Sequence, residues 1–179
     1  MRCFLPDLRR LYFWSGWLKQ MKKNLTIISD SAQTTKNIGA MLARELSKTF
    51  FGKGAAIVAL KGDLGAGKTT FVLGFLEYFG IKPHAASPTF VIMKRYKINS
   101  KLKIKNSKTE SIYHLDAYRL HSKKDLDVLG FNEILNNPQN IILVEWPERI
   151  KRARFRNKIG IEFYYGKEEN ERRIIFGKK

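Results

Sequence analysis

Eight consecutive residues, 62–69, have the types and spacing of a loop that binds phosphate groups. They read Gly-Asp-Leu-Gly-Ala-Gly-Lys-Thr and match every position of the Walker A pattern G-x-x-x-x-G-K-[ST]. In such a loop the glycines allow backbone N–H groups to turn toward a phosphate, and the lysine, Lys68, adds a positive charge for the outer phosphates. The hydroxyl of Thr69 is the type of group that a phosphate-binding loop places on Mg²⁺. The pattern therefore predicts a nucleotide site.

The segments on either side of this loop are the ones that the mechanism requires. Residues 55–60 form an apolar run typical of a buried parallel strand, and residues 69–79 place apolar side chains at helical spacing. Strand, glycine loop and helix follow in the required order, and the helix N-terminus favours an anion. A chance match in a glycine-containing turn would lack this context.

Other side chains could complete a site for hydrolysis. Glu145 ends a second buried strand, 140–145, where enzymes of this type place the acid that holds the metal. Thr89 could bind phosphate and metal as a switch threonine, and Asp116 could position the attacking water or contact Mg²⁺. Taken singly these signals are weak. A carboxylate at a strand end often forms a surface salt bridge, and a His-x-Asp sequence such as 114–116 is more often a structural hydrogen-bonded pair.

Three further features bear on the nucleotide. Trp146 could be core packing or part of the nucleotide pocket, and Arg119 could be a phosphate contact or a salt-bridge partner. The guanine-reading pattern Asn-Lys-x-Asp has its nearest match at residues 157–160, which lack the acid. We therefore predict adenine as the base.

The remaining patterns predict an α/β fold of the P-loop NTPase type, with a mostly parallel central sheet flanked by helices and a β-hairpin insertion. Asp30 and Gln33 indicate a capping box at the start of a helix over 31–48. The other expected elements are an edge strand at 25–29, strands at 90–98 and 111–118 around an exposed basic loop, short helices over 125–135 broken at Gly130, and a closing hairpin of 159–165 with 172–176.

Length and composition suit one domain, 21–179, preceded by an N-terminal extension, 1–20, that is weakly ordered or outside the fold. Asp7, Arg9 and Arg10 interrupt the extension, which makes it a poor signal peptide and leaves a basic amphipathic helix as the alternative. The single cysteine excludes an intrachain disulfide, and no run approaches the ~18 apolar residues of a membrane span. These features favour a cytoplasmic location for the protein.

The net charge of +18 is concentrated in three segments. Residues 1–23, 94–110 and 149–158 together account for +17. A polyanion partner such as RNA would explain the segregation through counterion release. A solubilising surface explains it equally well, and no RNA-binding signature accompanies the charge.

Five motifs occur together, in the order and spacing of the TsaE (YjeE) family, which this chain resembles over residues 25–176. They are Thr35-Lys36-Asn37-Ile38-Gly39, the glycine loop, Ser87-Pro88-Thr89-Phe90, Tyr113-His114-Leu115-Asp116-Ala117-Tyr118-Arg119-Leu120, and Glu145-Trp146. The resemblance implies Mg-ATP binding, slow and partner-stimulated ATP hydrolysis, and work with the TsaB and TsaD proteins. Together these proteins would make threonylcarbamoyladenosine at position 37 of tRNAs reading ANN codons.

The resemblance also implies residue roles. Thr35 would border the adenine, Thr69 and Glu145 would bind Mg²⁺, and Lys68, Asp116 and Thr89 would serve hydrolysis. The nucleotide would also contact Asp63, Leu64, Gly65, Ala66, Gly67, Thr70, Glu148 and Arg172. The segment between Tyr96 and Tyr113 is longer and more basic than the family's usual connection, and the extension has no family counterpart, so contacts with partners or tRNA stay open.

Two other functions remain compatible with the residues. A small-molecule kinase would use the same phosphate-binding loop, but it needs an acceptor pocket with a base and clamping arginines, which we cannot locate in the sequence. An RNA-binding protein regulated by ATP would use the basic segments, and its tRNA binding would be steeply salt-dependent.

Overall fold

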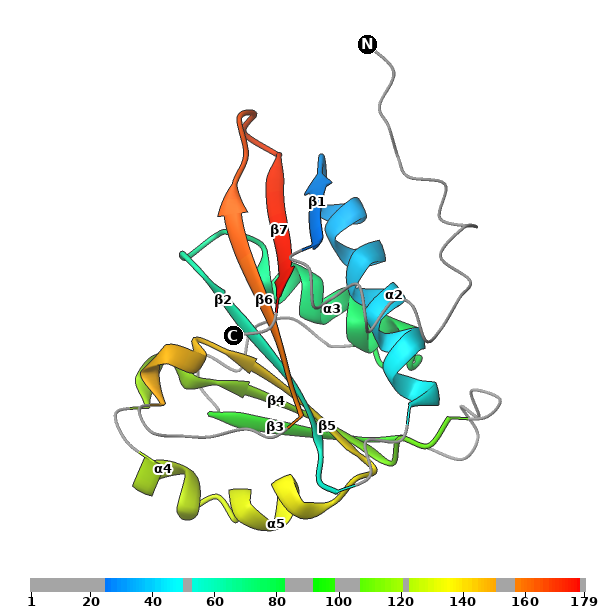
Figure 1. Cartoon of the computed structure of the whole chain (residues 1–179), viewed down its shortest axis with the longest axis vertical. Helices are drawn as coiled ribbons and strands as arrows, with labels where there is room; N and C mark the ends of the chain where they lie inside the picture. The colour runs from blue at the N-terminus through cyan, green and yellow to red at the C-terminus, as the bar shows by residue number, and fades with distance from the viewer. Residues whose placement is uncertain are drawn as a thin grey trace.

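A seven-stranded sheet organises the protein in the computed structural model (Figure 1), which describes residues 25–49, 53–82, 92–98, 107–120, 123–150 and 157–177. Thr89, the extension 1–20 and residues 99–106 of the basic loop lie outside the described residues. None of the helices in the described ranges is long and apolar enough to cross a membrane.

The strands lie in the order β1-β7-β6-β2-β5-β4-β3. Their bounds are β1 Leu25–Ser29, β2 Ala56–Gly62, β3 Met93–Lys97, β4 Ser111–Asp116, β5 Asn140–Glu145, β6 Lys158–Tyr165 and β7 Arg172–Gly177. The four central strands, β6, β2, β5 and β4, are mutually parallel. The remaining pairs, β1–β7, β6–β7 and β3–β4, are antiparallel.

The sheet is therefore mixed, and the prediction of a mostly parallel sheet is wrong. The physical reason lies in the connections, because a short turn returns the chain antiparallel to the strand it leaves, whereas a parallel neighbour needs a long crossover. The two predicted hairpins, β3–β4 and β6–β7, are present, and each adds antiparallel pairing outside the parallel centre. β1 extends one side by pairing with β7, and it is an edge strand as predicted.

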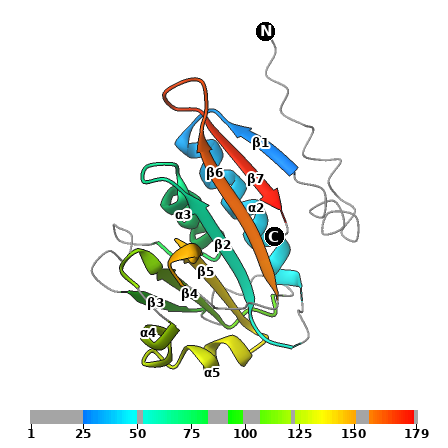
Figure 2. The same cartoon turned by 60° about the vertical axis from the view of Figure 1, so that its left-hand side comes forward.

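Helices cover the two faces of the sheet unequally (Figures 1 and 2). The long helices α2 (Ala32–Lys48) and α3 (Lys68–Tyr78) cover one face, and the short helices α4 (Lys123–Asp127) and α5 (Phe131–Asn136) cover the other. Alternate residues of β2, β5 and β4 enter different cores. Val58 packs in the α2–α3 core, and its neighbour Ile57 packs in the α4–α5 core.

Local details differ from the predicted boundaries for identifiable reasons. The predicted capping box is wrong, since Ser31 and not Asp30 is the N-cap of α2, and its Oγ accepts the Thr34 N–H at 3.1 Å. β4 ends at Asp116, short of the predicted residue 118. The Asp116 carboxylate accepts the Tyr118 N–H at 3.1 Å and starts the 3₁₀ helix η3 (Ala117–Arg119). The short helices flank Gly130 as predicted.

Candidate nucleotide-binding site

The glycine loop joins the carboxyl end of β2 to the first turn of α3. Gly65 and Gly67 have φ of 76° and 99°, values that L side chains rarely adopt, so the pattern's glycines are needed for the turn. Lys68 is only 4% exposed, and its Nζ donates to the carbonyl oxygens of Gly62 and Asp63, both at 2.7 Å. The loop thus closes around the ammonium group of its own lysine.

Lys68 is a buried cation with an uneven environment. Burial lowers the pKa of its ammonium group, while the carboxylates of Glu145, Glu148, Asp116 and Asp63 oppose this shift. Its Nζ also lies 4.0 Å from the centroid of the Trp146 ring. Because its hydrogen bonds go to neutral carbonyls, an anionic phosphate would stabilise this charge further. The lysine's surroundings therefore fit a phosphate ligand.

Thr69 and Glu145 meet although 76 positions separate them in the sequence. The Thr69 hydroxyl donates to the Glu145 carboxylate at 3.1 Å from either oxygen. Glu145 also contacts His114, whose Nε2 is 2.9 Å from Oε1. A hydroxyl and a carboxylate are hard oxygen donors of the kind that Mg²⁺ accepts beside phosphate oxygens, so this pair fits the predicted metal.

Asp116 ends the strand beside Glu145. The two residues are opposite each other in the parallel β4–β5 register, at the carboxyl ends of both strands. Asp116 is half-buried, and its charge reaches Lys68. Both predicted acids therefore lie at the carboxyl ends of the parallel strands, where α/β proteins bind ligands.

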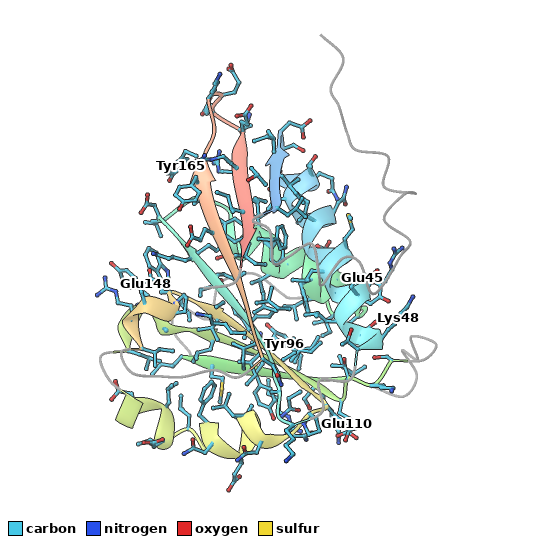
Figure 3. The ribbon with its side chains drawn as sticks, viewed as in Figure 1. Glu45, Lys48, Tyr96, Glu110, Glu148 and Tyr165 are labelled. Atoms are coloured by element: carbon cyan, nitrogen blue, oxygen red, sulfur yellow. The ribbon has the colours of Figure 1, made fainter. Side chains whose placement is uncertain are left out.

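Three other predicted residues are Leu64 in the loop itself, and Arg172 and Glu148 from other parts of the chain. Arg172 is half-buried in β7, and its Nη2 donates to the Gly65 carbonyl at 3.4 Å. Its guanidinium carbon lies 5.0 Å from the centroid of the Tyr165 ring. Leu64 is 82% exposed. Glu148 is exposed in η4 (Pro147–Arg149), just beyond the carboxyl end of β5. Figure 3 labels Glu148, and it also labels Tyr165 at the end of β6.

Thr35 lies in α2, next to Gly67 of the loop. It is 2% exposed, and its Oγ1 is 2.7 Å from Ser29 Oγ, so its hydroxyl is paired within the fold. A Cβ atom at Gly67 would lie 3.7 Å from Thr35 Cγ2 and 3.8 Å from Arg172 Cγ. Thr35 and Arg172, distant in sequence, therefore converge on the loop. Thr70 is half-buried in the first turn of α3.

Sequence reasoning missed two contacts. His114 was interpreted with Asp116 as a structural pair, but it hydrogen-bonds Glu145 on the neighbouring strand. The alternation of β4 was the available signal, since residues 114 and 116 face the same side. The second is Tyr165, whose hydroxyl donates to the Leu64 carbonyl. We found no sequence signal for it, because the contact depends on how β6 lies beside β2. Trp146, for which two roles were open, lies against Lys68.

Comparison with known proteins agrees with these motifs. The model of the family described as "Threonylcarbamoyl adenosine biosynthesis protein TsaE" matches residues 29–174. The tRNA threonylcarbamoyladenosine biosynthesis protein TsaE of Rickettsia conorii is 41% identical over 123 residues, 68% of this chain and 61% of the relative. The protein of that name from Bacillus subtilis is 40% identical over 101 residues, 56% of each chain.

A solved structure is also similar. The crystal structure of Bacillus subtilis YdiB aligns with a TM-score of 0.55 and 30% identity, and the alignment covers 86% of this chain and 84% of that one. The sequence matches span about three fifths of the relatives' lengths. Because the family model matches residues 29–174, which are most of this chain, and because the loop, Glu145 and Asp116 gather at one end of the sheet, this chain belongs to the TsaE family.

Proposed function

We propose that this protein binds Mg-ATP and hydrolyses ATP slowly as a cytoplasmic subunit of the machinery that makes N6-threonylcarbamoyladenosine at position 37 of tRNAs reading ANN codons. One observation supports the proposal most strongly. Lys68, Thr69 and Glu145, from two distant parts of the sequence, are gathered at the carboxyl ends of β2 and β5. That gathering is what phosphate and metal binding require.

Each residue has a definite task in this proposal. The loop N–H groups and Lys68 bind the phosphates, and Arg172 and Glu148 border the nucleotide. Thr69 and Glu145 would hold Mg²⁺, which when bound would offset charge on the phosphate oxygens. Asp116 orients the attacking water, a role that its half-buried position at the end of β4 allows. Thr89 would sense the outer phosphate.

We further propose that ATP acts as a conformational signal to the TsaB and TsaD proteins. Thr89 and Asp116 would report whether the outer phosphate is present, and the partner surface would change with it. Any contact with tRNA would be made through this complex or weakly through the basic segments. ATP would then control assembly and would not activate the tRNA base.

The experiment is co-purification with TsaB and TsaD, with and without ATP, followed by an assay for the modified adenosine. We expect a complex whose stability depends on the nucleotide, and modified tRNA only when all components and ATP are present. Absence of a complex under both conditions would overturn the assignment. A Lys68→Ala variant is the matched negative control, because it removes the charge that binds phosphate.

A further inference from the structure

His114 is a buried side chain that the proposed function does not yet use. Its Nε2 lies 2.9 Å from Glu145 Oε1, and both side chains are 3% exposed. In the β4–β5 register His114 is opposite Leu143, two residues before the pair formed by Asp116 and Glu145. The imidazole therefore approaches the Glu145 carboxylate from β4, at a position two residues nearer the amino end of that strand than Asp116.

Glu145 is consequently held from two other elements. Thr69 approaches it from α3 and His114 from β4. A threonine hydroxyl rotates freely and is itself a predicted metal ligand, so it cannot alone orient the carboxylate. An imidazole fixed on a central strand can. A carboxylate that binds a metal is ionised and only accepts hydrogen bonds, so Nε2 must bear the proton in that state.

We propose that His114 is a positioning residue for the metal site: its Nε2–H holds the Glu145 carboxylate in the orientation that binds Mg²⁺. This inference rests on the proposed function. Partners of this kind, which hold a metal ligand without touching the metal, typically change metal affinity or activity by about 10- to 100-fold when they are lost. His114 contacts neither the loop backbone nor Lys68 in any interaction that the structure shows, so its effect is confined to the metal-dependent part of ATP binding.

The prediction separates positioning from a purely structural role. A structural role would lower stability and leave the effect of metal on ATP binding unchanged. A positioning role reduces the metal effect and spares ATP binding in the absence of metal. Ser111 provides the matched control, because it is a buried polar residue of the same strand whose hydroxyl accepts from Arg95 at 3.2–3.3 Å, away from Glu145.

The test compares the full-length protein with His114→Leu, His114→Gln and Ser111→Ala. For each, calorimetry measures the Kd of ATP with Mg²⁺ and with EDTA, and electron paramagnetic resonance measures Mn²⁺ binding in the presence of ATP. We expect His114→Leu to weaken Mn²⁺ binding at least about tenfold and to leave the Kd in EDTA within about twofold. His114→Gln, which restores an N–H at similar reach, recovers most of the loss, and Ser111→Ala retains the metal effect.

The outcomes distinguish this inference from the proposed function. If the unaltered protein binds neither ATP nor Mn²⁺ with ATP, the proposed function fails. If it binds both and His114→Leu binds Mn²⁺ equally well, the function stands and the role of His114 is wrong. Should His114→Leu not fold, His114→Asn replaces it, because its shorter amide does not reach Glu145, and the same two results decide.

Discussion

The two faces of the sheet differ in how they are covered and in what they hold. On one face the 17-residue α2 and the 11-residue α3 pack against strands whose inward side chains include His114 and Glu145. On the other face the 5-residue α4 and the 6-residue α5 bury an apolar cluster, and the turn between them leaves Val128 87% exposed. Of the residues proposed above for phosphate and metal, Lys68, Thr69 and Glu145 belong to the first face, whereas the second serves to bury the strands.

The site depends on one close contact between the two long helices, α2 and α3. A Cβ atom at Gly74 of α3 would overlap the carbonyl oxygen of Lys36 in α2, and one at Gly39 of α2 would overlap the carbonyl oxygen of Phe71. The backbones of α2 and α3 therefore touch at two reciprocal glycines. This contact fixes the helix that begins at Lys68 and brings Thr35 next to the loop.

The substitution with the largest expected effect disrupts that contact. Gly74→Ala must push α2 and α3 apart, because the atom it meets is backbone and cannot rotate away, and we expect a loss of at least about 4 kcal/mol in the free energy of unfolding. Gly130→Ala, on the other face, is the matched control. Its φ of 65° costs only about 1–2 kcal/mol, since nothing lies within 4 Å of an added Cβ. Urea unfolding measures both, and a Gly74→Ala protein as stable as Gly130→Ala would refute the close contact.

A second comparison uses two buried leucines, Leu76 on α3 and Leu126 on α4. Truncation to alanine should cost about 3 kcal/mol in each case, because each loses a buried side chain. Only Leu76→Ala, on the helix that positions the loop, should also weaken ATP binding severalfold. Thermal unfolding and ATP titration at 15 °C test this, and equal weakening by both substitutions would show that the faces do not differ.

The third prediction concerns turnover. Asp116→Ala should lower the ATP hydrolysis rate at least about 100-fold while ATP affinity changes little, because the carboxylate acts on water and not on the bound phosphates. Asp127→Ala removes an exposed carboxylate from α4, where it accepts from Asn132 at 3.2 Å, and should hydrolyse ATP normally. Single-turnover kinetics would settle the matter: an Asp116→Ala protein that hydrolyses ATP at the unaltered rate has its role wrongly assigned.

The smallest effect is a pH dependence of stability. Burial holds the pKa of Lys68 below its ordinary 10.5, so protonated Lys68 costs stability at neutral pH. Between the folded and unfolded pKa values the unfolded chain binds more protons, and stability therefore rises with pH in that window. Without nucleotide, the unaltered protein should gain stability relative to Lys68→Met as pH approaches 10.5. Urea unfolding across this range checks the sign, and a relative loss would contradict it.

Prediction from sequence succeeded where the signal was local. The strand, loop and helix around 62–69, the buried strand ending at Glu145 and the closing hairpin follow from periodicity and turn residues. Pairing between distant strands has no local signal. The alternation of β4 indicates only the face on which His114 lies, and no pattern places Glu145 beside His114 or Leu64 beside Tyr165, so both contacts were missed. The error in sheet type shares this origin only for β1, which pairs with β7, the last strand of the chain; the other two antiparallel pairs lie within the predicted hairpins.

Calorimetric titration of Mg-ATP into the unaltered protein and into Lys68→Ala tests the nucleotide site most directly. We expect saturable binding by the unaltered protein, with one nucleotide per chain. We expect Lys68→Ala to bind at least about 100-fold more weakly, since that substitution removes the ammonium group that the loop encloses. No binding by the unaltered protein, or equal affinity of the two proteins, would contradict the assignment of this end of the sheet as an ATP site.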